Sequence, residues 1–372
     1  MSSDSRRSYS LDLARGFCLV LMTVDHLPQN IFGRFSNVGF GPFGFFTAAS
    51  AFVFISGIVS AKTYGATYSK LGAWATWARV SKRIAQIYAV NTGMFLVLLA
   101  CAWTGLLKHN VFWQEYDLLF SDPWTALERG LLLLYRPGYL DILPMYVVFL
   151  VCVVPLLAAI RAGWRWFALA VSVLVWFFAQ RDPDANVLNP LGYQILFVVG
   201  LIIGSSWDEF AEQSSRNLLK VLGWIASGLA LTLLLARFVT GLLRIVPDIP
   251  HWPALIELDN NGPLRLLNFM WFLVLAVHIW VRLPEWLRED NPVARWVSTL
   301  GRHSLPVFAW SILATHLSMA LMPGYPSRPW ALVDMVLMLS TLAIPAFLGE
   351  RWRSVHAIPR SEGWSAGLPV QR

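Results

Sequence analysis

Long apolar runs recur along the chain, and short polar segments separate them. A helix that crosses the hydrocarbon core of a bilayer needs about 20 mostly apolar residues. Runs of this kind predict membrane-spanning helices over residues 11–28, 40–61, 84–107, 140–160, 165–180, 187–205, 218–239, 264–283, 296–320 and 330–349. The pattern therefore predicts an all-α, polytopic integral membrane helix bundle with about ten transmembrane helices. We expect a single transmembrane domain over residues 1–350 and a basic cytoplasmic tail over 351–372.

The distribution of Lys and Arg among the connecting segments predicts how the chain is oriented. If the N-terminus is cytoplasmic, 18 of these residues fall in cytoplasmic segments and nine on the opposite side. Cytoplasmic loops of membrane proteins carry such an excess of positive residues. We therefore expect both termini in the cytoplasm.

Composition agrees with a membrane location and excludes other classes. Only 14% of the residues are charged, against about 25% in an ordinary soluble domain. The net charge of +7 reflects the excess of Lys and Arg in the predicted cytoplasmic loops. It does not indicate nucleic-acid binding, because no basic patch has the density that such binding needs. Cys18, Cys101 and Cys152 are odd in number and far apart, which excludes a disulfide framework. Without a CxxC or HExxH pair, no metal site is expected.

The first predicted span carries charged residues at membrane depth, where they are costly and usually functional. Arg15 and His26 are eleven residues apart, so at about 100° per residue they lie within about 20° on one helix face. At 1.5 Å per residue, about 16 Å separates them along the helix. Asp12 lies on the same polar stripe. Alternatively, Arg15 and Asp12 form a buried packing pair, and His26 lies at the interface.

Polar residues also stand near the start of two later spans. Asp141 opens the fourth span at the outer face, where it would orient His26 and stabilise an imidazolium. It would serve equally well as a helix N-cap. Arg302 and His303 lie about one and a half turns into the ninth span, in the same half of the membrane as Arg15. Two arginines at one depth suit an anionic ligand, unless Arg302 extends to the interface.

Two outward loops, residues 107–139 and 240–264, are longer than a simple connection requires. The first combines Trp and Tyr with carboxylates, and the second combines Trp252 and His251 with Glu257 and Asp259. This combination is typical of amphipathic segments at the interface, because Trp and Tyr favour the headgroup level. It would also suit a platform on which aromatic faces stack against a polar acceptor such as a sugar.

Six sequence blocks follow one another along the chain. They are residues 11–16 with 25–26, 51–57, 139–146, 189–191 with Gln194, 262–267 and 301–308. In this order they resemble the OpgC family of osmoregulated periplasmic glucan succinyltransferases, within the acyltransferase-3 superfamily. The first block looks like the superfamily's signature of an arginine, ten residues and a histidine, and residues 139–146 are the most specific to OpgC. Ser50 and Asn268 replace a glutamate and a histidine of the family pattern, which points to a different acceptor or weaker activity.

The resemblance implies a bacterial inner-membrane O-acyltransferase that moves succinyl from cytoplasmic succinyl-CoA to hydroxyls of a periplasmic glucan. It implies no permanently bound cofactor, no metal and no nucleic acid; the partners are the lipid bilayer, acyl-CoA and the glucan. The residues expected to serve catalysis are His26, Asp141 and Arg15. Those expected to bind the donor are Arg15, Arg302, His303 and Asp12. Those expected on the acceptor side are Arg265, Asn268 and Trp252.

A membrane transporter of an anionic or acylated solute is the chief alternative. Proton-coupled carriers also place Asp, Arg and His inside the membrane, although the chain shows no internal repeat of the kind many carriers have. A non-catalytic partner of a glucan synthase is a second alternative. Transfer of label from acyl-CoA to an outside acceptor would distinguish an enzyme from both.

Overall fold

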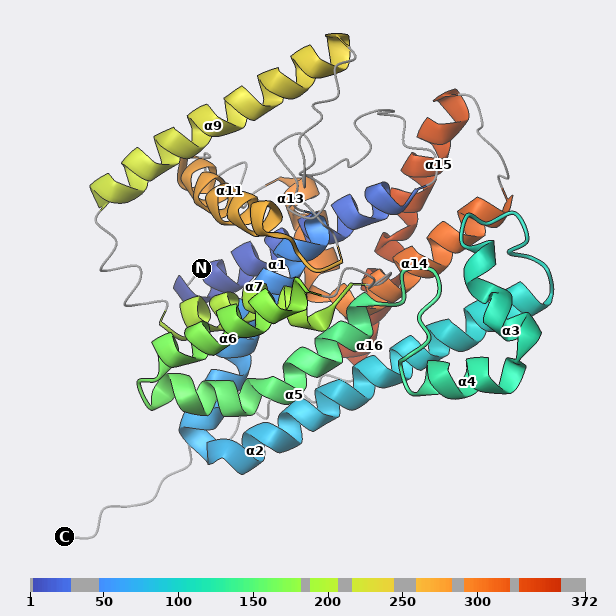
Figure 1. Ribbon diagram of the computed structural model, residues 1–372, viewed down its shortest axis with the longest axis horizontal. Helices are drawn as coiled ribbons and strands as arrows, with labels where there is room; N and C mark the ends of the chain where they lie inside the picture. The colour runs from blue at the N-terminus through green and yellow to red at the C-terminus, as the bar shows by residue number, and fades with distance from the viewer. Residues whose placement is uncertain are drawn as a thin grey trace.

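The computed structural model describes residues 3–27, 47–181, 188–206, 216–243, 259–282, 291–321 and 328–355. Regular structure in these ranges is helical, which confirms the predicted all-α class. The helices are α1 (Ser3–His26), α2 (Ala48–Trp103), η2 (Trp113–Tyr116), α3 (Asp117–Ser121), α4 (Pro123–Leu131), α5 (Ile142–Arg161), α6 (Arg165–Ala179), α7 (Pro190–Ser205), α9 (Arg216–Leu243), α11 (Pro263–Arg282), α13 (Pro292–Arg302), α14 (Ser304–Leu321), α15 (Arg328–Thr341) and α16 (Ala343–Val355). Figure 1 shows α1 and α7 near the centre, between α2 with α5 and the pair α9 and α11.

Five of the described helical stretches are long and apolar enough to cross a membrane, judged by length and composition. They are Ala48–Trp103, Ile142–Arg161, Pro263–Trp280, Ser304–Leu321 and Pro329–Arg351. Helices α6 and α7 and the segment Lys220–Thr232 are shorter apolar helices. The chain is therefore a multi-pass membrane protein. The count of ten spans and the cytoplasmic position of both termini stay predictions.

Helix α2 contains two predicted spans, 40–61 in part and 84–107 in large part, and turns back on itself at Gly72. Gly72 has φ +79° and ψ −177°, a conformation open to glycine because it has no Cβ. Beyond this turn, Arg79 donates a 2.8 Å hydrogen bond to the hydroxyl of Thr67, which precedes it. The segment expected as a cytoplasmic loop is thus helical on both sides of one glycine. In Figure 1 the long second arm of α2 runs beside α5.

Two other predicted spans, 296–320 and 330–349, each contain two helices, although Pro329–Arg351 as a whole is long and apolar enough to cross a membrane. In both cases a proline causes the break. A proline ring clashes with the carbonyl of the residue four positions earlier and has no N–H to donate. Pro306 accordingly ends α13 at Arg302, and Pro345 ends α15 at Thr341. Both prolines are tolerated in the first turn of the following helix.

Close helix packing holds α1 against α13 and α2 against α7. A Cβ at Gly16 would overlap the Val297 carbonyl, and one at Gly301 would overlap the Asp12 carbonyl. Gly57 and its partners on α7 allow a similar approach. Small residues let membrane helices pack at close range, where van der Waals contact supplies most of the attraction. The α1–α13 crossing sets the height of Arg15 relative to the start of α14.

Candidate functional site

His26 ends α1 and lies against the segment that precedes α5. Its ring stacks on Tyr139, with 3.8 Å between the ring centroids and 18° between the planes. Tyr139 has φ +65° and follows Gly138 at φ +58°, so two left-handed residues turn the chain beneath the imidazole. The Gly138 N–H donates to a Glu115 carboxylate oxygen at 2.8 Å, and the Tyr135 hydroxyl donates to the Glu115 carbonyl at 2.6 Å. The turn under His26 is therefore fastened to the short helix η2.

Burial shifts two ionisable groups of this turn. It raises the pKa of the Glu115 carboxyl above its usual range, although the Gly138 N–H acts in the opposite direction. Burial also raises the pKa of Tyr139 to about 12, with smaller contributions from nearby carboxylates. The Tyr139 phenol is therefore neutral at physiological pH, and its ring offers His26 an uncharged stacking surface.

His316, in the middle of α14, is a second histidine in this region, and the sequence analysis missed it. Its side chain is buried, and its Nδ1 lies 2.9 Å from the Ile312 carbonyl. A carbonyl only accepts, so Nδ1 carries the proton and Nε2 presents a lone pair. The ring lies against Gly138, where a Cβ would overlap it, and 5.7 Å from the Phe112 ring. A lone histidine in an apolar run was the only available sequence signal.

Among the described residues, Nδ1 of His26 and Nε2 of His316 are buried nitrogens that make no hydrogen bond. The carboxylate of Asp25, beside His26, likewise has a buried oxygen with no partner in the described ranges. Buried polar atoms are normally satisfied, so each exception needs an explanation. Other described side chains, among them Ser56 and Asn91, also have such atoms, but those of Asp25, His26 and His316 lie around one turn, where a polar ligand could supply the partner of each.

Asp141 lies at the N-cap position of α5, as one of the two sequence interpretations holds, but its side chain does not cap that helix. Its carboxylate instead accepts from the Leu188 N–H at 3.2 Å. No hydrogen bond joins Asp141 to His26 in the part of the chain that the structure describes. The carboxylate therefore ties the segment before α7 to the start of α5, close to the turn that carries Tyr139.

The expected acceptor-side residues Arg265 and Asn268 are both buried at the start of α11. Tyr193 of α7, which the sequence analysis missed, is also fully buried and lies within electrostatic range of Arg265 and Asp141. Its hydroxyl forms a hydrogen bond with Ser50, at the position where the family pattern has a glutamate. These side chains gather where α2, α7 and α11 meet. The remaining acceptor-side residue, Trp252, lies outside the described residues.

Arg15, eleven residues before His26 on α1, lines a separate cavity of about 330 Å³. Its guanidinium donates a hydrogen bond to the Ser304 hydroxyl and lies 5.7 Å from the centroid of the Phe52 ring. Its Nε is buried and makes no hydrogen bond within the described structure. The other lining residues are Val59, Ser60, Thr63, Tyr64, Arg79, Lys82, Arg83, Gln86 and Tyr146.

Three cations of the second α2 arm face this cavity, and their role was not foreseen from the sequence. Lys82 and Arg83 follow Arg79 by three and four residues, and both therefore lie on the same helix face as Arg79. The turn at Gly72 carries that face back toward the first arm and Arg15. The cavity therefore concentrates four positive charges in a space of modest size. Such a site suits a ligand with several negative charges.

Arg302, expected to share a ligand with Arg15, does not line this cavity. It forms an ion pair with Asp12 at 3.9 Å and another with Glu350 at 3.3 Å, and its side chain is 44% exposed. His303 is buried, with its ring against Gly349 of α16. The structure thus groups Asp12, Arg302 and His303 at the contact of α1 and α13 with α16, apart from the basic cavity.

The described residues contain no group of three His, Cys, Asp or Glu side chains that would hold a metal ion. The family model described as OpgC protein matches residues 7–354 of the chain. No curated protein and no solved structure matches the chain.

Proposed function

The chain belongs to the OpgC protein family, a membership that implies a membrane acyltransferase-like role in glucan modification, and from this premise we propose a specific reaction. The protein moves a succinyl group from succinyl-CoA in the cytoplasm to a hydroxyl of a periplasmic glucan, across a bacterial inner membrane. One observation carries the proposal. Helix α1 joins a cavity lined by cations, at Arg15, to a cluster of unsatisfied imidazoles, at His26.

The basic cavity is the site for the donor. Coenzyme A carries several phosphate charges, and Arg79, Lys82 and Arg83 offer cations for them on one helix face. Arg15, deeper in the protein, has a buried Nε–H available for a group of the donor. About 16 Å of helix separates Arg15 from His26, and the extended acyl-pantetheine arm lies along this stretch.

Acyl transfer takes place at the imidazole cluster. His26 accepts the proton of the glucan hydroxyl while that oxygen attacks the thioester carbonyl carbon. The tetrahedral intermediate then collapses, the C–S bond breaks, and the imidazolium returns its proton to the departing coenzyme A thiolate. The products are a succinyl ester and free coenzyme A, with no change of oxidation state. The π-face of Tyr139 fixes the plane of the His26 ring during both proton transfers.

His316 serves the acceptor rather than the departing thiol. Its Nδ1–H is held by the Ile312 carbonyl, so the lone pair of Nε2 points to where a second sugar hydroxyl can donate. Arg265 and Tyr193 provide donors on the other side of the acceptor, near Asp141. This division predicts that His26 governs turnover and that His316 governs the affinity for the glucan.

Transfer of label tests the proposal. The purified chain is reconstituted in vesicles, with succinyl-CoA labelled in the succinyl group on one side and glucan on the other. We expect labelled glucan with the wild type and none with His26→Gln. Movement of labelled solute without a covalent product would show a carrier instead and overturn the proposal. Equal transfer from acetyl-CoA would overturn the assignment of the acyl group.

A further inference from the structure

A second cavity, of about 640 Å³, lies on the other flank of the first α2 arm and takes no part in the proposed reaction. It is bounded by α2, by the connection from α5 to α6, and by the end of α7. Its lining combines cations such as Arg161 and Arg165, hydroxyls such as Ser206, and very small residues such as Gly65. The small residues leave the space open, and the cations and hydroxyls make it suitable for an anion.

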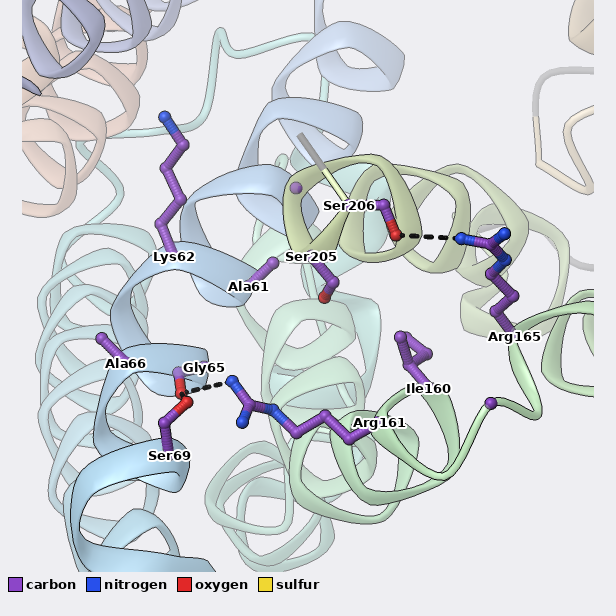
Figure 2. Close-up of a pocket in the computed structure, with 12 residues that line it drawn as sticks. Ala61, Lys62, Gly65, Ala66, Ser69, Ile160, Arg161, Arg165, Ser205 and Ser206 are labelled. Carbon is purple, nitrogen blue, oxygen red and sulfur yellow. Dashed lines mark hydrogen bonds between the residues drawn. The ribbon is translucent and has the colours of Figure 1, made fainter. Parts of the chain in front are cut away.

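Two arginines flank the open space, as Figure 2 shows. Arg161 reaches from the end of α5 and donates to the Gly65 carbonyl at 2.8 Å. Arg165 reaches from the start of α6 to the Ser206 hydroxyl at 3.5 Å. A guanidinium has five N–H donors and no acceptor. The planar, forked arrangement of the donors matches the oxygens of a phosphate group.

The surroundings of the cavity are those of a membrane surface. Trp164 and Trp166 are exposed beside Arg165, and exposed tryptophans are typical of the headgroup level. All three segments that bound the cavity lie at the ends of predicted spans on the predicted cytoplasmic side. A ligand in this cavity would therefore meet the arginines at the depth where lipid phosphates lie.

An apolar track leads away from the cavity along α6. Phe167, Val171, Leu174 and Phe178 are all exposed. Their spacings of four, three and four residues place them on one face of the helix. A soluble phosphate ester would make no contact with this apolar face, whereas the acyl chains of a phospholipid would lie along it. The charges and the track together distinguish a lipid from a free anion.

We propose that this cavity binds the phosphate headgroup of an anionic phospholipid, whose acyl chains lie along the exposed face of α6. Basic pockets between membrane helices on the cytoplasmic side commonly hold such headgroups. Arg161 and Arg165 bind the phosphate oxygens, and Ser206 orients Arg165. The bound lipid fastens α2, the α5–α6 connection and α7 together at the membrane surface.

Native mass spectrometry of the detergent-purified full chain tests the proposal, with phosphatidylglycerol or phosphatidylcholine as the probe. We expect retention of phosphatidylglycerol in preference to phosphatidylcholine. The double variant Arg161→Gln/Arg165→Gln should weaken phosphatidylglycerol binding about 30-fold, the loss expected for two interfacial cations. Arg129→Gln is the matched control, because it removes the same charge from an exposed side chain on α4, which does not line the cavity, and it should leave the binding unchanged.

A competition experiment on the wild-type chain makes the test independent of how well the variants fold. Inorganic phosphate and coenzyme A are each added to the complex with phosphatidylglycerol, and neither should displace the lipid. Displacement by either one would show that the cavity takes soluble phosphates and would overturn the assignment to lipid. Equal retention of the two lipids, or an equal loss in the Arg129→Gln control, would overturn it as well.

Discussion

If the basic cavity binds the donor, removing its cations one at a time should lower the donor affinity by different amounts. Arg79 is exposed, whereas Arg15 is partly buried and has a buried Nε. An exposed pair contributes about 0.5–1 kcal/mol, which corresponds to about a two- to fivefold change in Kd. A partly buried, charge-assisted hydrogen bond contributes about 1.5–3 kcal/mol, or roughly 10–150-fold. Arg15→Gln should therefore weaken coenzyme A binding far more than Arg79→Gln.

Isothermal titration calorimetry with coenzyme A measures both effects, at about 0.05 M and about 0.5 M NaCl, because salt screens exposed charges more than buried ones. The contribution of Arg79 should nearly vanish at high salt, and that of Arg15 should largely remain. Arg129→Gln is the control, since Arg129 lies on α4, away from the cavity. Equal losses for Arg15 and Arg79, or wild-type affinity in the Arg15 variant, would refute the assignment of this cavity to the donor.

Three further predictions concern the imidazole cluster, the helix packing and the turn beneath His26. His316→Gln keeps an acceptor atom and should raise KM for the glucan only a few-fold, whereas His316→Phe should raise it at least tenfold with kcat little changed; a collapse of kcat in both variants would make His316 the base instead. Gly301→Ala should lower Tm strongly in a thermal melt, because its Cβ would overlap a backbone carbonyl, while Gly228→Ala, with nothing within 4 Å, should leave Tm unchanged or higher. The raised pKa of Glu115 means that the folded state favours the protonated carboxyl, so the free energy of unfolding should fall as the pH rises from the ordinary carboxyl pKa through the raised one. In thermal melts, Glu115→Gln should lack this pH dependence of Tm. An identical pH dependence in both proteins would contradict the prediction.

The fold class and the two ends of the site were predictable from the sequence, because they depend on local patterns. Apolar runs predict membrane helices, and the eleven-residue spacing of Arg15 and His26 needs only helical geometry, which the single helix α1 provides. Pro306 and Pro345 favour the breaks before α14 and α16, although Pro155 lies inside the continuous helix α5, so a proline by itself does not specify a break. Hydropathy alone does not reveal these breaks.

The rest of the site depends on contacts between residues far apart in the chain. Arg79 reaches the cavity of Arg15 only because one left-handed glycine turns α2 back. His316 meets the segment beneath His26 through tertiary packing, and nothing near it in sequence indicates this. Arg302 was expected beside Arg15 from its depth alone, but depth does not specify the side of a helix, and an ion pair with Glu350 holds it elsewhere.

Mass spectrometry of periplasmic glucans tests the central claim most directly. Glucans are compared from cells that lack the gene and carry either the wild-type chain or His26→Gln, at matched levels in the membrane. The account predicts glucans heavier by the mass of whole succinyl groups with the wild type, and unsubstituted glucans with His26→Gln. Succinylated glucans in cells with the His26→Gln variant would contradict it.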